Sequence, residues 1–239
     1  MFDIHSHIIY HIDDGSRDLD ESLTLIRKDY AEGARAIIAT PHYSVQYPTD
    51  PVRVRAKLAT IEEAAASGPA LRLYAGNEVL YFDSMTERLQ SGDILTLADS
   101  HYTLIEFYPE ESYQVILRAI RNIRNAGYRP IIAHAERFHA IQEHGLAEVR
   151  DLGAYVQLST EPLSHKGMSG LLDRETRFIR KALRQQEADF LGTDMHRKDH
   201  RPPVLRDAID WIQKNLDPDY GAAVLQENAE ALVRDEELY

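Results

Sequence analysis

The sequence has no cysteine among its 239 residues. This absence excludes disulfide bonds, thiolate metal sites and catalysis by a cysteine nucleophile. Any phosphatase chemistry must therefore be done by water, a metal ion or another type of side chain.

The sequence also lacks long apolar runs and an excess of positive charge. No segment approaches the roughly 20 apolar residues of a membrane-spanning helix, and the N-terminus lacks the basic and apolar regions of a signal peptide. Because Met1 leads almost directly into the first expected strand, we expect no targeting segment, no membrane insertion and a cytoplasmic location. The 27 Lys and Arg against 39 Asp and Glu give a formal net charge of −12, which argues against nucleic-acid binding and against a nuclease.

Strand-like and helix-like segments alternate along the chain. Seven short apolar segments are separated by amphipathic segments at a spacing of about 30 residues, the length of a β-α-β unit. This alternation predicts an α/β fold with a mostly parallel sheet. The length suits one α/β barrel, so we expect a single domain over residues 1–239.

Capping and turn residues predict the limits of several segments. Asp20 is the expected N-cap of the first helix, and Gly33 is its expected end. A second helix is expected from Arg53 to Ala66, ended by residues 67–69. The stretch 159–170 is expected to form a loop.

Two histidines follow the first apolar segment. His5 and His7 are two positions apart, so in a strand both imidazoles point to the same side. Such a pair can bind a divalent metal ion. A single His-x-His pair also occurs by chance, and the interpretation depends on what other strands contribute.

Further metal-ligand types stand at or just after the ends of other expected strands, where parallel α/β folds gather their functional groups. Taken alone, each could be an ordinary hydrogen-bonded histidine, an ion-paired carboxylate or a helix cap. Independent roles of that kind do not explain why so many share one end of six strands and their loops. The candidate ligands are His5, His7, Asp14, His42, Glu78, Glu106, His134, Asp194 and His196.

Five histidines and four carboxylates exceed the needs of one zinc ion. They suit two or three divalent ions, and Mn²⁺, Fe²⁺ and Zn²⁺ are all compatible with mixed nitrogen and oxygen ligands. Clustered ions of this kind promote hydrolysis of phosphate esters. The remaining histidines lack this placement and are interpreted as surface or structural residues.

Two arginines follow candidate ligands closely. Arg137 comes three residues after His134, and Arg201 comes five after His196. A guanidinium matches the geometry of a phosphate group, although on spacing alone either could be an ordinary surface arginine.

These motifs together resemble the PHP (polymerase and histidinol phosphatase) superfamily, and more narrowly the bacterial capsule-type, metal-dependent protein-tyrosine phosphatases. The resemblance covers essentially the whole chain. It is carried by His5-Ser6-His7, Asp13-Asp14-Gly15, Ala39-Thr40-Pro41-His42, Gly76-Asn77-Glu78, Leu104-Ile105-Glu106-Phe107, Ala133-His134-Ala135-Glu136-Arg137-Phe138, Asp194-Met195-His196, Arg201-Pro202-Pro203 and Glu227-Asn228-Ala229.

The resemblance implies a distorted (β/α)7 barrel of the TIM-barrel type with three divalent metal ions, commonly manganese, with iron, zinc or cobalt as alternatives. It implies that the substrate is phosphotyrosine on the tail of a bacterial tyrosine autokinase that controls capsular or exopolysaccharide synthesis. By the family pattern, one ion would be held by His5, His7, Glu78 and Asp194, a second by Glu78, Glu106 and His134, and a third by Asp14, His42 and His196. Arg137 and Arg201 match the phosphate-binding arginines of the family.

Two other functions stay open at this point. One is hydrolysis of a small phosphomonoester, as in a histidinol-phosphate phosphatase. The other is an inactive, metal-binding regulator that docks on a kinase, which the intact ligand set and both arginines disfavour. The sequence leaves the oligomeric state open.

Overall fold

The computed structural model describes residues 1–66, 68 and 70–239. Its strands are β1 (Phe2–Ser6), β2 (Ala36–Ala39), β3 (His42–Tyr43), β4 (Arg72–Ala75), β5 (Glu78–Leu80), β6 (Tyr102–Glu106), β7 (Arg129–Ile132), β8 (Tyr155–Ser159) and β9 (Phe190–Gly192). All the strand pairs are parallel, in the orders β1-β2-β4 and β3-β5-β6-β7-β8-β9. The predicted α/β fold with a parallel sheet is confirmed.

The sheet curls into a barrel. The last strand returns to the first, because the Asp194 backbone N–H donates to the His5 carbonyl at 2.9 Å and the His7 N–H donates to the Met195 carbonyl at 2.8 Å. The second and third barrel strands are each split in two, β2 from β3 and β4 from β5. Counting each split strand once, the described chain forms the distorted (β/α)7 barrel that the resemblance implied.

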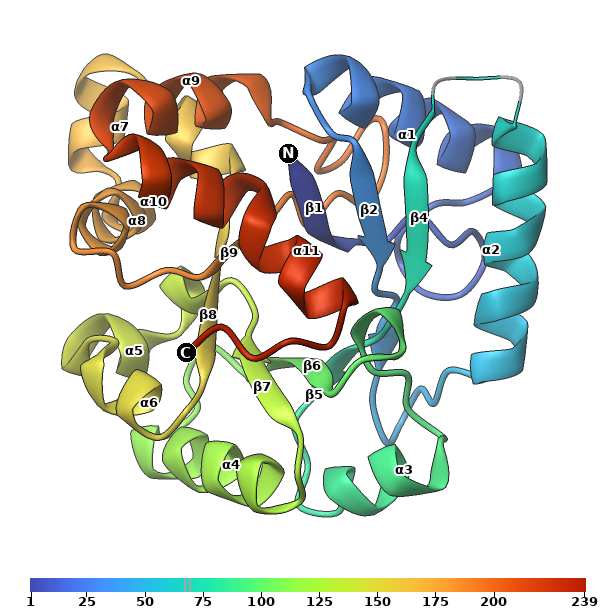
Figure 1. Ribbon diagram of the computed structural model, residues 1–239, viewed down its shortest axis with the longest axis horizontal. Coiled ribbons are helices and arrows are strands. Elements are labelled where there is room, and N and C mark those ends of the chain that lie inside the picture. Colours follow the sequence, from blue (N-terminus) through green and yellow to red (C-terminus); the bar gives the residue numbers. More distant parts are fainter. Residues whose placement is uncertain (67, 69) are drawn as a thin grey trace.

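The barrel is surrounded by helices, as Figure 1 shows. The longer ones are α1 (Leu19–Glu32), α2 (Pro51–Ala65), α4 (Tyr113–Asn125), α8 (Arg174–Arg184) and α9 (Arg206–Asn215). The shorter ones are α3 (Met85–Ser91), α5 (His139–His144), α6 (Ala147–Asp151), α7 (Gly167–Leu172), α10 (Pro218–Ala222) and α11 (Asn228–Val233), and α10 and α11 are joined by a π-helical turn over Ala223–Glu227. Among the described residues, none of the helices is both long and apolar enough to cross a bilayer.

Helix burial follows the spacing of apolar residues. In α4, the side chains of Ile116, Ile120 and Ile123 recur every three or four positions and are fully buried against the sheet. Most strand residues are buried, because helices cover one face of the sheet and the other face lines the barrel interior. Every residue of β1 is buried, including the polar Asp3 and His5.

Three of the predicted limits were wrong. The N-cap of α1 is Asp18, whose side chain accepts from the Glu21 N–H, and Asp20 lies inside the first turn. Helix α2 begins two residues early, at Pro51, because Asp50 caps it. The stretch 159–170 is largely helical, with a short 3₁₀ segment at Glu161–Ser164 and the start of α7.

One further limit was confirmed, and another was not tested. Gly33 ends α1 with a backbone φ of 128°, a conformation that residues other than glycine rarely adopt. The signal at residues 67–69 lies largely outside the described residues.

The far end of the barrel is closed by the last residues of the chain. The Tyr102 hydroxyl donates to the Glu236 carbonyl at 2.8 Å, and Arg124 forms an ion pair with Glu237 at 3.1 Å. Figure 1 shows this segment crossing the strands after α11. The open end of the barrel is therefore the other one, where the strands finish.

Candidate metal centre

All nine candidate ligands lie at the C-terminal end of the barrel. They come from six of the barrel strands or from the loops that directly follow them. His5 lies in β1 and His7 follows it, Asp14 lies in the next loop, His42 opens β3, Glu78 opens β5, Glu106 ends β6, His134 follows β7, and Asp194 and His196 follow β9.

The split strands place two of these ligands. The expectation was that His42 and Glu78 follow the ends of strands, whereas each begins a short second segment. These segments pair in register, with His42 opposite Glu78. Gly76 lies in the break between β4 and β5 and lets Leu97 pack closely, because a Cβ atom there would lie 2.6 Å from Leu97 Cδ2.

The first group of ligand atoms comes from His5, His7, Glu78 and Asp194. The two Nε2 atoms are 3.2 Å apart, and both lie 3.1–3.4 Å from Glu78 Oε2 and Asp194 Oδ1. Ligands of a tetrahedral ion with bonds near 2.1 Å are separated by about 3.4 Å. The spacing of these four atoms therefore fits one cation.

Hydrogen bonds on the outer side of the two imidazoles fix their orientation. His5 Nδ1 lies 3.1 Å from Gln157 Oε1, and His7 Nδ1 lies 2.8 Å from Asp13 Oδ2. Both partners are acceptors, so each neutral ring carries its proton on Nδ1 and turns the Nε2 lone pair inward. Two lone pairs and two carboxylate oxygens that face one another can hold a cation between them.

A second group surrounds His42. Its Nδ1 lies 3.0 Å from Glu78 Oε2 and 3.1 Å from Glu106 Oε1. His134 Nε2 is 2.7 Å from Glu78 Oε1 and 3.9 Å from Glu106 Oε2. The ligand atoms that converge here are those of His42, Glu78 and Glu106, whereas the resemblance implied Glu78, Glu106 and His134. His134 contacts Glu78 and lies farther from Glu106.

The third group contains His7, Asp14, His42 and His196. Asp14 Oδ1 lies 3.6 Å from His42 Nε2 and 3.5 Å from His196 Nε2. Asp14 is exposed to solvent whereas His196 is buried, so this group forms the outer side of the centre.

Three buried polar atoms of the centre have no hydrogen-bond partner among the described residues: Glu78 Oε2, His134 Nδ1 and His196 Nε2. His196 Nδ1 contacts the Asp194 carbonyl at 2.8 Å, which directs the Nε2 lone pair toward Asp14. Buried polar atoms without a partner are costly, and a bound cation would satisfy Glu78 Oε2 and His196 Nε2. The residues present thus fit divalent ions.

Electrostatics within the cluster are strong. Burial by itself lowers the pKa of His42, but Glu78 and Glu106 outweigh it and raise the value to about 10. The pKa of His7 is likewise raised well above its usual value, against burial, chiefly by Asp13. Burial opposes ionisation of Glu78, yet the surrounding histidines hold its pKa well below the usual range. Without a metal, protons on the histidines supply the positive charge that a cation would otherwise bring.

Both predicted arginines reach the centre. Arg137 Nη1 donates to Asp194 Oδ2 at 2.6 Å, and Arg201 Nη1 lies 3.2 Å from the same oxygen. The other oxygen of Asp194 faces the first group of ligands. Arg137 is partly exposed and Arg201 half-exposed, so both line the solvent side.

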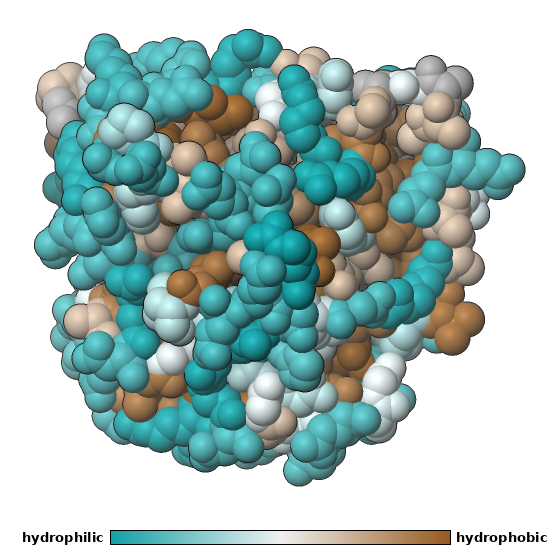
Figure 2. Space-filling model, in the orientation of Figure 1, coloured by the Kyte–Doolittle hydropathy of each residue, from teal (hydrophilic) through white to brown (hydrophobic). Residues whose placement is uncertain are grey.

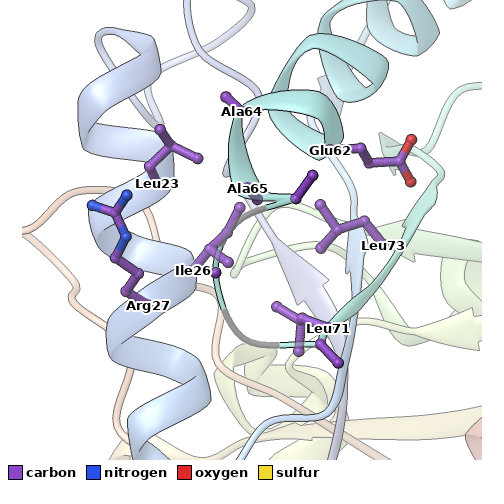
Figure 3. A pocket seen from close by; sticks show the side chains of 11 residues that line it. Leu23, Ile26, Arg27, Glu62, Ala64, Ala65, Leu71 and Leu73 are labelled. Carbon is purple, nitrogen blue, oxygen red and sulfur yellow. The ribbon is translucent and has the colours of Figure 1, made fainter.

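A large cavity adjoins the centre. It has a volume of about 770 Å³, and its floor includes Asp14, His42 and Glu106. A smaller cavity of about 310 Å³ lies elsewhere, between α1 and the end of α2, where Leu23 and Ile26 face Leu71 and Leu73 (Figure 3). Figure 2 shows apolar residues gathered in a recess over β2 and β4, on a face that is otherwise largely hydrophilic. The candidate ligands line only the larger of these two cavities.

Comparison with known proteins agrees with this geometry. The sequence pattern of the CpsB/CapC family, described as capsular polysaccharide synthesis, matches residues 1–234. The chain belongs to the CpsB/CapC family.

Three curated relatives are similar to the chain over almost their full length. The chain is 32% identical to the tyrosine-protein phosphatase CpsB of Streptococcus agalactiae serotype V, covering 98% of both chains. It is also 32% identical to CpsB of Streptococcus pneumoniae, covering 99% of both, and 28% identical to the tyrosine-protein phosphatase YwqE of Bacillus subtilis, covering 100% of this chain and 94% of the other.

Solved structures show the same fold. One solved structure comes from work on YwqE from Bacillus subtilis and CpsB from Streptococcus pneumoniae, described as "unique metal-dependent tyrosine phosphatases". It superposes on this chain with a TM-score of 0.90 at 25% identity, and the match covers 100% of this chain and 96% of the other. A D-hydantoinase superposes with a TM-score of 0.57 at 12% identity, covering 95% of this chain and 69% of the other, which extends the likeness of fold alone. The resemblance predicted from the motifs is confirmed.

Sequence reasoning missed two residues that orient this family member's candidate ligands. Asp13, treated only as part of a turn and a motif, accepts from His7 Nδ1 and from the His42 N–H at 2.9 Å. Gln157 lies inside β8, and its Oε1 accepts from the His134 N–H at 2.8 Å as well as from His5. The available signal for Gln157 was a polar residue in the middle of an otherwise apolar strand.

Proposed function

We propose that this CpsB/CapC family member is a metal-dependent protein-tyrosine phosphatase, a phosphoric monoester hydrolase that works without a cysteine. The observation that carries the proposal is the first group of ligand atoms, two inward-facing imidazole lone pairs and two carboxylate oxygens at the spacing of a single cation. The activities named for its relatives support the same conclusion.

The proposed ligand set is the one expected from the sequence. His5, His7, Glu78 and Asp194 would hold one ion, Glu78, Glu106 and His134 a second, and Asp14, His42 and His196 a third. The proximity of His42 to Glu78 and Glu106, and of His7 to Asp14, supports a shared cluster. Manganese is the proposed metal. When bound, such ions acidify a water molecule and neutralise charge on phosphoryl oxygens.

The chain's own residues supply the rest of the site. Glu78 uses both carboxylate oxygens, one toward His134 and the other toward His5, His7 and His42, which suits it to bridge two ions. Arg137 and Arg201 are proposed as the catalytic arginines. From the solvent side, their guanidinium groups would bind the phosphoryl oxygens that the ions leave uncovered and stabilise the charge that spreads over them during transfer.

The proposed substrate is phosphotyrosine on the tail of a bacterial tyrosine autokinase that regulates capsular or exopolysaccharide synthesis. The match to a capsular polysaccharide synthesis family supports this role. The cytoplasmic location stays a prediction of the sequence.

Turnover and metal content test the proposal together. Protein purified without chelator should contain divalent metal and hydrolyse a phosphotyrosine peptide much faster than histidinol phosphate. EDTA should abolish the activity, and Mn²⁺ should restore it. Because no thiol is present, iodoacetamide should have no effect. A protein with no bound metal and no activity after Mn²⁺ addition would refute the proposal, and a preference for histidinol phosphate would favour the small-molecule alternative.

A further inference from the structure

The large cavity beside the metal centre shares its floor with the candidate ligands. Asp14, His42 and Glu106 line its base, while Ile12, Leu80 and Tyr47 give it apolar walls. One ligand can therefore reach the metals with a phosphate and fill the cavity with the group that carries it. A volume of about 770 Å³ lies within the usual range for small-molecule sites and is far larger than a short aliphatic alcohol needs.

The outer wall of the cavity is the segment between β3 and α2, and both of its ends are anchored. At the start, the Tyr43 ring is buried, with its centroid 6.2 Å from that of Phe82. At the end, the Thr49 hydroxyl donates to the His42 carbonyl, and Asp50 caps α2 by accepting from the Val52 N–H at 2.9 Å.

The middle of this segment forms a defined turn. The Tyr47 N–H donates to Ser44 Oγ at 3.1 Å, and the Ser44 N–H donates to the Tyr47 carbonyl at 3.3 Å. These bonds use backbone atoms of Tyr47, so its side chain takes no part in holding the turn. The turn thus holds the Tyr47 ring at the wall of the cavity that His42 also lines.

The Tyr47 side chain is 78% exposed although it lines the cavity. Among the described residues, three of the seven exposed large hydrophobic side chains fall between positions 45 and 52. Of these three, Tyr47 lines the cavity beside the candidate ligands, where a substrate would cover its exposed ring. An aromatic ring there offers a flat surface that favours another ring over an aliphatic chain.

We infer that Tyr47 is a specificity-determining residue, and that this cavity binds the phenyl ring of a phosphotyrosyl side chain whose phosphate lies at the metal centre. The inference rests on the proposed function and adds to it a physical reason for preferring aryl over alkyl phosphates. The ring of Tyr47 packs against the substrate ring, and the Tyr47 hydroxyl is not required.

The test compares two phosphonates that are not hydrolysed, phenylphosphonate and methylphosphonate, by calorimetry on the Mn²⁺-loaded protein. The wild type should bind phenylphosphonate more tightly, and Tyr47→Ala should reduce that preference about tenfold, the scale of one aromatic contact. Tyr47→Phe should retain it. Val45→Ala is the matched control, because Val45 is 67% exposed on the same segment but does not line the cavity.

Turnover provides a second readout with the same variants. Tyr47→Ala should lower kcat/KM about tenfold for a phosphotyrosine peptide and leave kcat/KM for glycerol phosphate unchanged. Equal losses on both substrates, or no loss of phenyl preference, would overturn the inference. A wild type that prefers phenylphosphonate but hydrolyses no phosphotyrosine would refute the proposed function and leave the binding site intact.

Discussion

Buried carboxylates occur at both ends of this barrel, and they behave in opposite ways. Glu78 and Asp194, at the open end, have pKa values held well below the usual range. Asp29, near the end closed by the chain termini, is equally buried, and its pKa is raised well above the usual value. Burial favours the protonated form in all three cases, so the neighbours decide the outcome.

The neighbours differ sharply. Glu78 is surrounded by four histidines. Asp194 contacts His5, His7 and both arginines. Among the described residues, neither oxygen of Asp29 has a hydrogen-bond partner. Asp3 and Glu32 nearby raise its pKa further, and the Met1 amine only partly opposes them. Positive neighbours thus favour the ionised form of Glu78 and Asp194, whereas burial and negative neighbours favour the protonated form of Asp29.

Replacing ligands of the open end should have the largest effect. We expect His5→Ala or His7→Ala to abolish phosphatase activity, because the first group loses half of its nitrogen donors. Folding should persist, because both side chains lie at the C-terminal end of the barrel and contact other candidate ligands there. Metal analysis measures the bound ions, a phosphatase assay measures the activity, and circular dichroism measures the folding. The control variant His139→Ala, at an exposed position, should keep full activity. A double variant, His5→Ala with His7→Ala, that stays active would show that the open end does not bind a catalytic metal.

The arginines test whether the open end also binds phosphate. We expect Arg137→Ala or Arg201→Ala to lower kcat/KM on a phosphotyrosine peptide by roughly 10²–10³-fold, the scale for losing one preorganised donor, with metal content unchanged. Arg→Lys should recover only part of the loss, because an ammonium cannot make a two-pronged contact. Arg121→Ala, on the exposed face of α4, is the control. Near-normal kinetics in both Ala variants would make Arg137 and Arg201 ordinary surface residues.

Metal affinity should depend on pH in a defined direction. The pKa of His42 is about 10 and that of His7 is raised, so the metal-free centre carries protons at neutral pH that a cation must displace. We therefore expect apparent affinity to rise with pH between 6 and 8, about tenfold per pH unit for each proton released. Calorimetry in buffers of different ionisation enthalpy counts those protons. A flat profile with no proton release would contradict the electrostatic description of the open end.

The closed end should show the smallest effect, on stability alone. The raised pKa of Asp29 means that the folded state retains a proton that the unfolded chain loses above about pH 4. The free energy of unfolding should consequently fall as pH rises from 4 toward the folded pKa. Asp3 and Asp189 are also buried and have pKa values raised to about 6, so they contribute to the same decline. We expect Asp29→Asn to reduce the decline and to gain about 1 kcal/mol relative to wild type at pH 8.

Urea denaturation at pH 5 and pH 8 measures the effect of Asp29→Asn. Asp20→Asn is a suitable control, since Asp20 is exposed on the same helix. If Asp29→Asn and the wild type lose the same free energy of unfolding between pH 5 and pH 8, Asp29 is not responsible for the decline in stability.

The features of the fold and the site that depend on neighbouring residues in the sequence could be predicted, and those that depend on distant residues could not. The pair His5 and His7 needed only the two-residue period of a strand, and the seven-fold alternation needed only the spacing of apolar segments. The register of the strands could not be predicted from the sequence. His42 lies opposite Glu78 because two strands break at matching positions 36 residues apart, and the Asn77 side chain stabilises this arrangement by donating to the Pro41 carbonyl. Asp13 and Gln157 were missed because their role is to contact ligands, and residue type alone does not reveal that.

Local competition explains the error at the first helix. Asp18 and Asp20 are both acceptable caps, and the choice between them is made by tertiary contacts. The Asp18 carbonyl accepts from Ser16 Oγ, and Ser22 Oγ donates to the Ile8 carbonyl, which ties the start of α1 to the loop after β1. Asp29 carried no sequence signal, because an aspartate in a helix usually faces solvent.

The hydrogen bonds that join the residues after β9 to the first strand have a consequence for how the protein is made. Asp194 donates to the His5 carbonyl, so the first group of ligands forms only when the last barrel strand docks on the first. During synthesis the ribosome must produce almost the entire chain before that contact is possible, and a nascent barrel keeps an unpaired strand at each edge until then. The metal centre is therefore assembled at the end of translation, and a truncated chain that stops before β9 has neither a closed barrel nor a complete first group.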